Sequence, residues 1–416
     1  MSLETALDTD FVRSQFPAFA SPALQGQAFF ENAGGSYTCR QVIDRLTRFY
    51  HDRKVQPYAP YEASRLGGAE MDEARARLAA LMGVEGDELS FGPSTSANTF
   101  VLANAVRLWL RGRQAAIVVT DQDHEANSGV WRRLADEGIE IREWRIDPET
   151  GYLDPAGLVP LLADGKVRLV CFPHCSNIVA EINPVAEICA MAKAAGAFTC
   201  VDGVSYAPHG LPDIPALGAD VYLFSAYKTY GPHQGIMVIR RGIGAALPNQ
   251  AHYFNADVLY KRFTPAGPDH AQVAACAGMA DYIDALHAHH FGGAETSPRA
   301  RNNAVHGLIR AHEAQLLQPL LDYLGARNDL RLIGPRVADR RAPTVAVDLR
   351  REAEPVAAAL AGQGIMAGGG NFYGVRPLAA LGIDTDQGVL RLSFVHYTSQ
   401  AEVTKLISAL DKVLRA

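Results

Sequence analysis

The chain has 416 residues, of which 48% are hydrophobic and 20% are charged, and its formal net charge is −6. This is an ordinary globular balance, and the length fits two domains better than one. A net acidic chain without a basic block lacks the positive patch that binds nucleic acid or an anionic membrane, so we expect neither as the main partner. The expected ligand is a small molecule.

The expected cellular setting follows from the amino terminus, the apolar runs and the cysteines. The first residues, MSLETALDTDFVRSQFPAF, contain no charged-then-apolar leader, and no run reaches the roughly 18 apolar residues of a membrane span. The six cysteines form no CxxC pair and several lie in apolar runs, which favours buried, reduced thiols. We therefore expect a cytoplasmic protein.

Between about residues 70 and 240, helical patterns alternate with short apolar strands. The predicted helices are 71–83, 96–109, 131–138 and 185–195. The predicted strands are 88–92, 115–120, 139–144, 168–172, 198–202, 221–225 and 235–240. Strands that are apolar on both faces and separated by helices indicate an α/β fold, with a mainly parallel seven-stranded sheet covered on both sides.

After about residue 270 the pattern becomes more helical. Helices are predicted over 271–290, onward to about 324, over 354–364 and from 402 to the end, with strands over 343–350 and 388–397. This order favours a smaller α+β unit. We expect a segment of residues 1–25 that joins the small domain, a large domain of residues 26–285 and a small C-terminal domain of residues 286–416.

Polar side chains follow several predicted strands at the point where each strand ends. In open α/β sheets, ligands bind beyond these carboxyl ends. Ser94 and Thr95 stand at a helix start, where free amides and the helix dipole favour a phosphate, although simple capping would also explain them. His124 follows strand 115–120, either as a ring-stacking or acid–base residue or as a structural one.

Three further strand ends carry Asn177, Asp202 and Lys228. Asn177 could bind a phenolic oxygen, and a turn would explain it as well. Isolated burial of the Asp202 carboxylate is costly, and a pyridinium N–H would be a suitable partner. A lysine such as Lys228 in a low-polarity pocket has a lowered pKa and forms an imine with an aldehyde. Lysine with aspartate is the pairing that pyridoxal phosphate (PLP) requires of a protein.

The motifs around these residues are ENAGG (31–35), GPSTSAN (92–98), DHEAN (123–127), SN (176–177), VDGVSYAPH (201–209) and SAYKTYGPHQG (225–235). Together with RLSFVHYTSQAEV (391–403), they resemble the class V aminotransferase family, the PLP-dependent enzymes of fold type I that include the cysteine desulfurases. The resemblance runs from about residue 28 to the end of the chain. Its most specific part is the VDG…SAYK pair.

The resemblance implies a role for each matched residue. Lys228 carries PLP as a Schiff base, Asp202 pairs with the pyridine nitrogen, and His124 stacks on the ring. Arg391 binds the substrate carboxylate through a bidentate pair. The residues implied to bind PLP are Ser94, Thr95, His124, Asn177, Asp202, Ser205, Ser225, Tyr227 and Lys228, and those expected at the substrate are Arg391, Asn32 and Asn371. Family members are homodimers, so a homodimer is implied here.

The chain departs from the desulfurase pattern at several positions. Ser205 stands where a Gln or His is usual, Tyr227 replaces the His before the lysine, and AGPD (266–269) replaces the partner-chain loop GTPN. The stretch 365–383 corresponds to the loop with the nucleophilic cysteine of desulfurases. It has no cysteine, and none of the six lies beyond Cys276.

The expected activity is therefore that of a PLP-dependent aminotransferase or of a C–S lyase that acts by β-elimination on a small amino acid. A true cysteine desulfurase, an epimerase and a catalytically silent assembly partner remain alternatives. No metal site is expected, because HAHH (287–290) indicates an exposed helix end and Cys171 and Cys175 have no second pair. GGG (368–370) indicates a flexible active-site loop.

Overall fold

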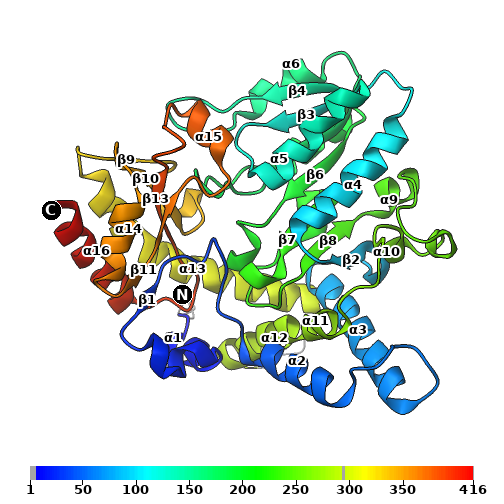
Figure 1. Ribbon diagram of the computed structural model, residues 1–416, viewed down its shortest axis with the longest axis horizontal. Coiled ribbons are helices and arrows are strands. Elements are labelled where there is room, and N and C mark those ends of the chain that lie inside the picture. The colour runs from blue at the N-terminus through cyan, green and yellow to red at the C-terminus, as the bar shows by residue number, and fades with distance from the viewer. Residues whose placement is uncertain (1–5, 293–295, 416) are drawn as a thin grey trace.

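The computed structural model describes residues 6–292 and 296–415, and its largest element is a seven-stranded sheet (Figure 1). The strands lie in the order β2-β8-β7-β6-β5-β3-β4. β8 runs antiparallel to both of its neighbours, and the other neighbouring pairs are parallel. Their bounds are β2 Leu89–Gly92, β3 Ala116–Thr120, β4 Glu140–Trp144, β5 Val167–Pro173, β6 Phe198–Asp202, β7 Val221–Ser225 and β8 Gly235–Ile239. The predicted mainly parallel seven-stranded sheet is confirmed.

Helices cover both faces of this sheet. Successive strand residues point to opposite sides, so apolar strands present side chains to both faces that must be buried. Val118 and Val170 pack into one core with α2, α3, α7, α11 and α12, whereas Ile117 and Leu169 pack into another with α4 and α5. The bounds are α2 Arg40–Asp52, α3 Glu62–Leu81, α4 Thr95–Leu110, α5 Glu125–Arg132, α6 Val159–Leu162, α7 Val185–Ala194, α8 Ile214–Leu217, α9 Arg241–Ala246, α10 Leu259–Arg262, α11 His270–Ala275 and α12 Ala277–Phe291. The large sheet therefore has a hydrophobic core on each face.

The C-terminal part contains a four-stranded antiparallel sheet, in the order β12-β13-β10-β9, with its own core. Its elements are β9 Arg331–Leu332, β10 Thr344–Asp348, α14 Glu354–Ala361, β11 Ile365–Met366, β12 Gly368–Gly370, α15 Val375–Ala380, β13 Val389–Ser393 and α16 Gln400–Arg415. Helix α13 (Pro298–Gly325) joins the two parts, because Leu308 packs in the core of the large sheet and Leu320 in the C-terminal core.

The N-terminal residues contact both parts of the chain. Strand β1 (Ala28–Phe29) pairs in parallel with β11. In and beside α1 (Thr9–Ser14), Arg13 Nη1 donates to Glu402 Oε2 at 2.7 Å, and Asp8 Oδ2 lies 2.9 Å from His289 Nε2. These contacts tie α16 and α12 to the same short segment. The domain boundaries given above stay predictions.

Two local expectations are wrong, and a third holds only in part. The helix predicted at 131–138 begins earlier, at Glu125, because the His124 side chain caps it, and a 3-10 turn follows over 133–137. Gly368–Gly370 is not a flexible loop but the edge strand β12, paired with β13. The HAHH segment ends α12 as expected, and His289 is exposed there and stacks on Phe11, but His287 is buried.

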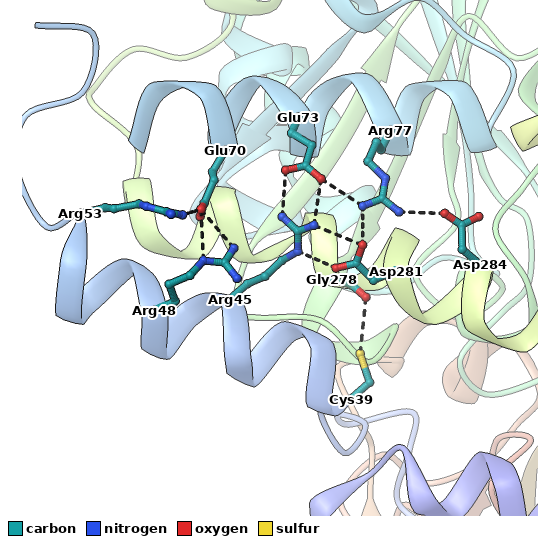
Figure 2. Close-up of polar contacts among 10 residues, drawn as sticks. All are labelled: Cys39, Arg45, Arg48, Arg53, Glu70, Glu73, Arg77, Gly278, Asp281 and Asp284. Atoms are coloured by element: carbon teal, nitrogen blue, oxygen red, sulfur yellow. Dashed lines mark hydrogen bonds and ion pairs between the residues drawn. The ribbon is translucent and has the colours of Figure 1, made fainter. Parts of the chain in front are cut away.

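A network of ion pairs links α2, α3 and α12 on the side away from the C-terminal sheet (Figure 2). Arg45 binds Glu73 at 2.8 Å and Asp281 at 2.5 Å. Arg77 also binds Asp281 and reaches Asp284 at 2.8 Å. Glu70, nearer the start of α3, forms ion pairs with Arg48 and Arg53. Because Asp281 is shared by two arginines on two helices, it couples the positions of all three.

The described part of the chain also bears on the expected setting. All six cysteines are buried and free, as predicted. Among the helices within residues 6–292 and 296–415, none has both the length and the apolar character that crossing a membrane requires.

Candidate functional site

A cavity of about 540 Å³ lies beyond the carboxyl ends of the parallel strands. Most of the predicted site residues line it, namely Thr95, His124, Asn177, Asp202, Ser205, Ser225, Tyr227, Lys228 and Arg391. Ser94, Asn32 and Asn371 lie outside its lining. Residues from both sheets therefore converge on one space, as the strand-end argument predicts.

One end of the cavity is formed by hydroxyl groups at the start of α4. Thr95 Oγ1 lies 2.8 Å from Ser225 Oγ, which ends β7. Ser94 caps the helix, because its Oγ accepts from Ala97 N at 3.1 Å. Gly235 on β8 allows this approach, since a Cβ there would lie 2.3 Å from the Ser94 carbonyl carbon. Hydroxyls and free helix amides together suit an anionic group.

Asp202 closes β6 and is buried at the cavity wall. Its Oδ1 accepts from Val204 N at 2.8 Å. Burial raises the pKa of Asp202 to about 6, and the charge of Lys228 partly opposes this rise. The neighbouring Asp123 carboxyl is also buried, and burial together with Asp202 raises its pKa well above the usual range. A cationic partner at Asp202 would keep that carboxylate ionised.

Lys228 stands in the 3-10 turn that follows β7. Burial, and then the charge of Arg391, lower the pKa of Lys228 to about 8, although Asp202 and Glu31 act in the opposite direction. The Lys228 Nζ lies 5.9 Å from the centre of the Tyr227 ring, which itself stacks on His233. A substantial fraction of the Lys228 amine is therefore neutral near pH 8, which a nucleophilic amine requires.

His124 stands at the start of α5, where its Nδ1 accepts from Ala126 N at 3.1 Å. Burial, followed by the charges of Lys228 and Arg391, lowers the pKa of His124 to about 4. The ring is therefore neutral at ordinary pH. Its centre lies 5.5 Å from that of Tyr373, with the two rings tilted by 48°.

The segment Asn371–Gly374 borders the cavity through Phe372 and Tyr373. Phe372 and Tyr373 both adopt the left-handed backbone region, with φ of 52° and 56°. The segment is held by two bonds to its carbonyls, from Asn177 Nδ2 to Phe372 O and from Glu125 N to Tyr373 O, each at 3.0 Å. Asn177 Oδ1 is buried and has no hydrogen-bond partner among the described residues. This acceptor is available to a ligand.

Arg391 extends from β13 and forms an ion pair with Glu31, a residue that was not predicted from the sequence. Its Nη2 donates to Glu31 Oε1 at 2.6 Å, and its guanidinium lies 3.8 Å from the centre of the Phe372 ring. Glu31 lines the cavity, while the next residue, Asn32, bonds to Tyr397 and to Ser393 O behind it. A turn over residues 32–34 follows Glu31, so the chain direction changes between these two neighbours.

Other lining residues also escaped the sequence argument, including Phe100, Arg133 and Phe372. They lie inside helices or in the loop over 371–374, where no strand end marks them. Tyr373 also lines the cavity, whereas Tyr37 and Arg376 do not.

One of the six cysteines, Cys175, borders the cavity. Its Sγ donates to Ala180 O at 3.3 Å, and burial raises its pKa to about 12. The thiolate that nucleophilic chemistry needs is therefore scarce. Over residues 6–292 and 296–415, no three His, Cys, Asp or Glu side chains gather as metal ligands would.

Comparison with known proteins agrees with this geometry. The model of the aminotransferase class-V family matches residues 28–253 and 302–406. An aminotransferase-like protein of Gibberella zeae, FGM3, is 32% identical over 417 residues, covering 97% of this chain and 98% of that protein. A cysteine desulfurase of Serratia proteamaculans is 28% identical, with 97% of each chain covered. The solved cysteine desulfurase of Thermococcus onnurineus superposes with a TM-score of 0.84 at 22% identity, covering 98% of each chain.

The chain belongs to the class V aminotransferase family, in its cysteine desulfurase-like branch. It is accordingly a PLP-dependent enzyme with the fold of type I PLP-dependent transferases. The family resemblance and the fold class predicted from the motifs are both confirmed.

Proposed function

We propose that PLP occupies the cavity with Lys228 as its covalent anchor. The chemistry of the lining supports this fit at each part of the cofactor. Thr95, Ser225 and the first amides of α4 suit the phosphate, and the buried Asp202 carboxylate suits a protonated ring nitrogen. The unpartnered Asn177 Oδ1 would accept a hydrogen bond from the ring hydroxyl. The neutral His124 ring would face the ring of the cofactor.

We propose that the enzyme acts on a small amino acid. Bound PLP withdraws electrons from the substrate Cα and so makes its proton acidic. Lys228, with a pKa near 8, is suited to take that proton and return it within the same cavity. Arg391 lines the cavity, and its charge lowers the pKa of Lys228. It would bind the substrate carboxylate.

The reaction that the site supports best is aminotransfer or β-elimination, without transfer of sulfur to a protein thiol. The observation that supports this choice is the lack of a reactive cysteine near Lys228. The stretch 365–383 has no cysteine, and the cavity's own Cys175 has a pKa of about 12. A persulfide would need a thiolate within reach of the substrate, and neither position supplies one.

Mass analysis of the cofactor tests this proposal. Purified holoprotein is mixed with a panel of amino acids in the absence of a keto acid, and the cofactor is then released. Conversion of PLP to pyridoxamine phosphate identifies an aminotransferase and its donor. Unchanged PLP with consumption of the amino acid identifies a lyase, or an epimerase if only the configuration changes. Persulfide on the protein after cysteine treatment contradicts the proposal, and a protein that holds no PLP contradicts it entirely.

We also propose a homodimer in the cytoplasm. The loop that includes Ala266–Asp269 lines a second cavity of about 340 Å³ beside Pro93 and Asn98, at the start of α4. A partner's loop placed there would lie close to the phosphate end of the site. Sedimentation of the purified protein gives the test, since a monomer at micromolar concentration would contradict it.

A further inference from the structure

The ion pair between Arg391 and Glu31 occupies the position that the substrate carboxylate would need. Arg391 is 3% exposed, and its Nη2 lies 2.6 Å from Glu31 Oε1 inside the cavity that Lys228 also lines. A carboxylate from the substrate would therefore meet a guanidinium that already has an anionic partner. The pair is part of the site, because both of its members line the same space.

The pair is incomplete on both sides. Arg391 Nε and Glu31 Oε2 are buried, and neither has a hydrogen-bond partner within the described ranges. An arginine and a carboxylate can form two parallel bonds, and here only one is made. A buried donor and a buried acceptor left open in one cavity are disfavoured unless a ligand completes them.

The surroundings fix the arginine more firmly than the glutamate. The Arg391 guanidinium packs on the Phe372 ring at 3.8 Å, and its side chain is 4% exposed, against 27% for Glu31. Two glycines leave the space that the Glu31 carboxylate fills. A Cβ at Gly34 would lie 2.9 Å from Oε1, and a Cβ at Gly368 would lie 2.9 Å from Oε2. Glu31 is thus the member that can be displaced.

We propose that Glu31 is a displaceable partner of Arg391, which allows the site to admit amines that lack an α-carboxylate as well as α-amino acids. This inference rests on the proposed function. With an amine, Arg391 keeps Glu31 and no buried cation is left without a partner. With an amino acid, the substrate carboxylate replaces Glu31 and gains the open Nε. The competition weakens binding of acids and leaves binding of amines unaffected.

The first test measures binding without turnover. Acetate and 3-phenylpropionate, which carry a carboxylate and no amine, are titrated into wild-type and Glu31→Gln holoprotein by calorimetry. We expect Glu31→Gln to bind at least one of them about tenfold more tightly or better, because Arg391 is freed. Glu31→Asp, which keeps the charge on a shorter side chain, should fall between the two. Equal cofactor absorbance and unfolding temperature show that the variants are folded.

The matched control is Glu143→Gln. Glu143 pairs with Arg132 at the same 2.6 Å and is 31% exposed, but neither residue lines the cavity. This variant should bind both acids within about twofold of the wild type. A Glu31→Gln protein that binds the acids no more tightly than the wild type, or no more tightly than Glu143→Gln, overturns the inference.

The second test compares L-phenylalanine with 2-phenylethylamine, and L-alanine with ethylamine, by the change in absorbance of bound PLP. We expect the wild type to respond to both members of at least one pair. Glu31→Gln should shift the preference at least tenfold toward the amino acid. A wild type that responds to the amino acids and to neither amine overturns the inference while leaving the proposed function intact. A holoprotein that responds to no amino acid of the full panel instead removes the proposed function, and this inference with it.

Discussion

Thr95 Oγ1 and Ser225 Oγ lie 2.8 Å apart although 130 residues separate them in the chain. The contact joins the start of α4 to the end of β7, directly before the turn that carries Lys228. The proposed phosphate end of the cofactor and its proposed covalent anchor are therefore held by the same strand. Removal of either hydroxyl should lower the affinity for the cofactor more than it lowers the stability of the fold.

Ser225→Ala should weaken PLP binding about tenfold or more, because a hydrogen bond to a charged group contributes roughly 1.5–3 kcal/mol. Titration of apoprotein with PLP, followed by quenching of tryptophan fluorescence, measures the dissociation constant. Thr404→Val removes a hydroxyl of α16, which bonds to Gln400 O, and should leave the constant unchanged. Equal affinities of Ser225→Ala and the wild type would remove the hydroxyl from the phosphate site.

Lys228→Ala should abolish covalent attachment of PLP and all turnover. Lys228→Arg keeps a cation but not a nucleophilic amine, and we expect the same loss. Borohydride reduction of the wild-type holoprotein, followed by peptide mass analysis, should place the cofactor on the peptide that contains Lys228. Recovery of the label on another lysine would contradict the assignment.

The attachment of PLP to apoprotein should accelerate as pH rises through about 8. Burial lowers the pKa of Lys228 to about 8. The neutral amine therefore becomes the major form above pH 8, whereas an ordinary lysine becomes mostly neutral only above its higher pKa. Asp202 raises the pKa of Lys228, so Asp202→Asn should move the midpoint to lower pH. Stopped-flow absorbance across pH 6–10 gives the profile. A midpoint above pH 10 would show that the amine is not perturbed.

Asp281→Asn should lower the free energy of unfolding by about 1 kcal/mol, because the residue joins arginines of α2 and α3 to α12 (Figure 2). The loss should shrink in 1 M salt, which screens partly exposed charges. Asp411→Asn, which breaks the more exposed pair with Arg415 on α16, should change stability by less than about 0.5 kcal/mol. Urea unfolding at two salt concentrations measures both. A salt-independent effect of Asp281→Asn would indicate packing rather than charge.

Most strands of the large sheet were predictable because they are short apolar runs, although β4 (EIREW) mixes charged and apolar residues. The start of α5 was not, because it depends on a bond from Ala126 N to the His124 ring that no periodicity reveals. Strand β12 consists of three glycines, whose intrinsic preference opposes a strand, and its pairing with β13 decides the outcome. Local pattern predicts an element only where tertiary contacts agree with it.

The cavity lining was predictable to the extent that it follows strand ends. Asp202, Lys228 and Asn177 all follow buried strands, and the structure brings them to one cavity. Glu31 was not predictable, because its pairing with Arg391 spans 360 residues and depends on the bridge that Glu31, just beyond β1, forms with Ser393 of β13. The residues of the 371–374 segment were equally hidden, since their place at the cavity depends on two hydrogen bonds to their carbonyls, from the Asn177 side chain and from Glu125 N.

Burial of all six thiols makes the folded protein a convenient background for site-specific labelling. Burial raises the pKa of Cys39, Cys175 and Cys189 to about 12, so maleimide should leave them unmodified while the fold persists. A single cysteine placed on an exposed position, such as Tyr253, which is 88% exposed, would then be the reactive handle of the native chain. A fluorophore attached there would report on the surface without disturbing any native thiol.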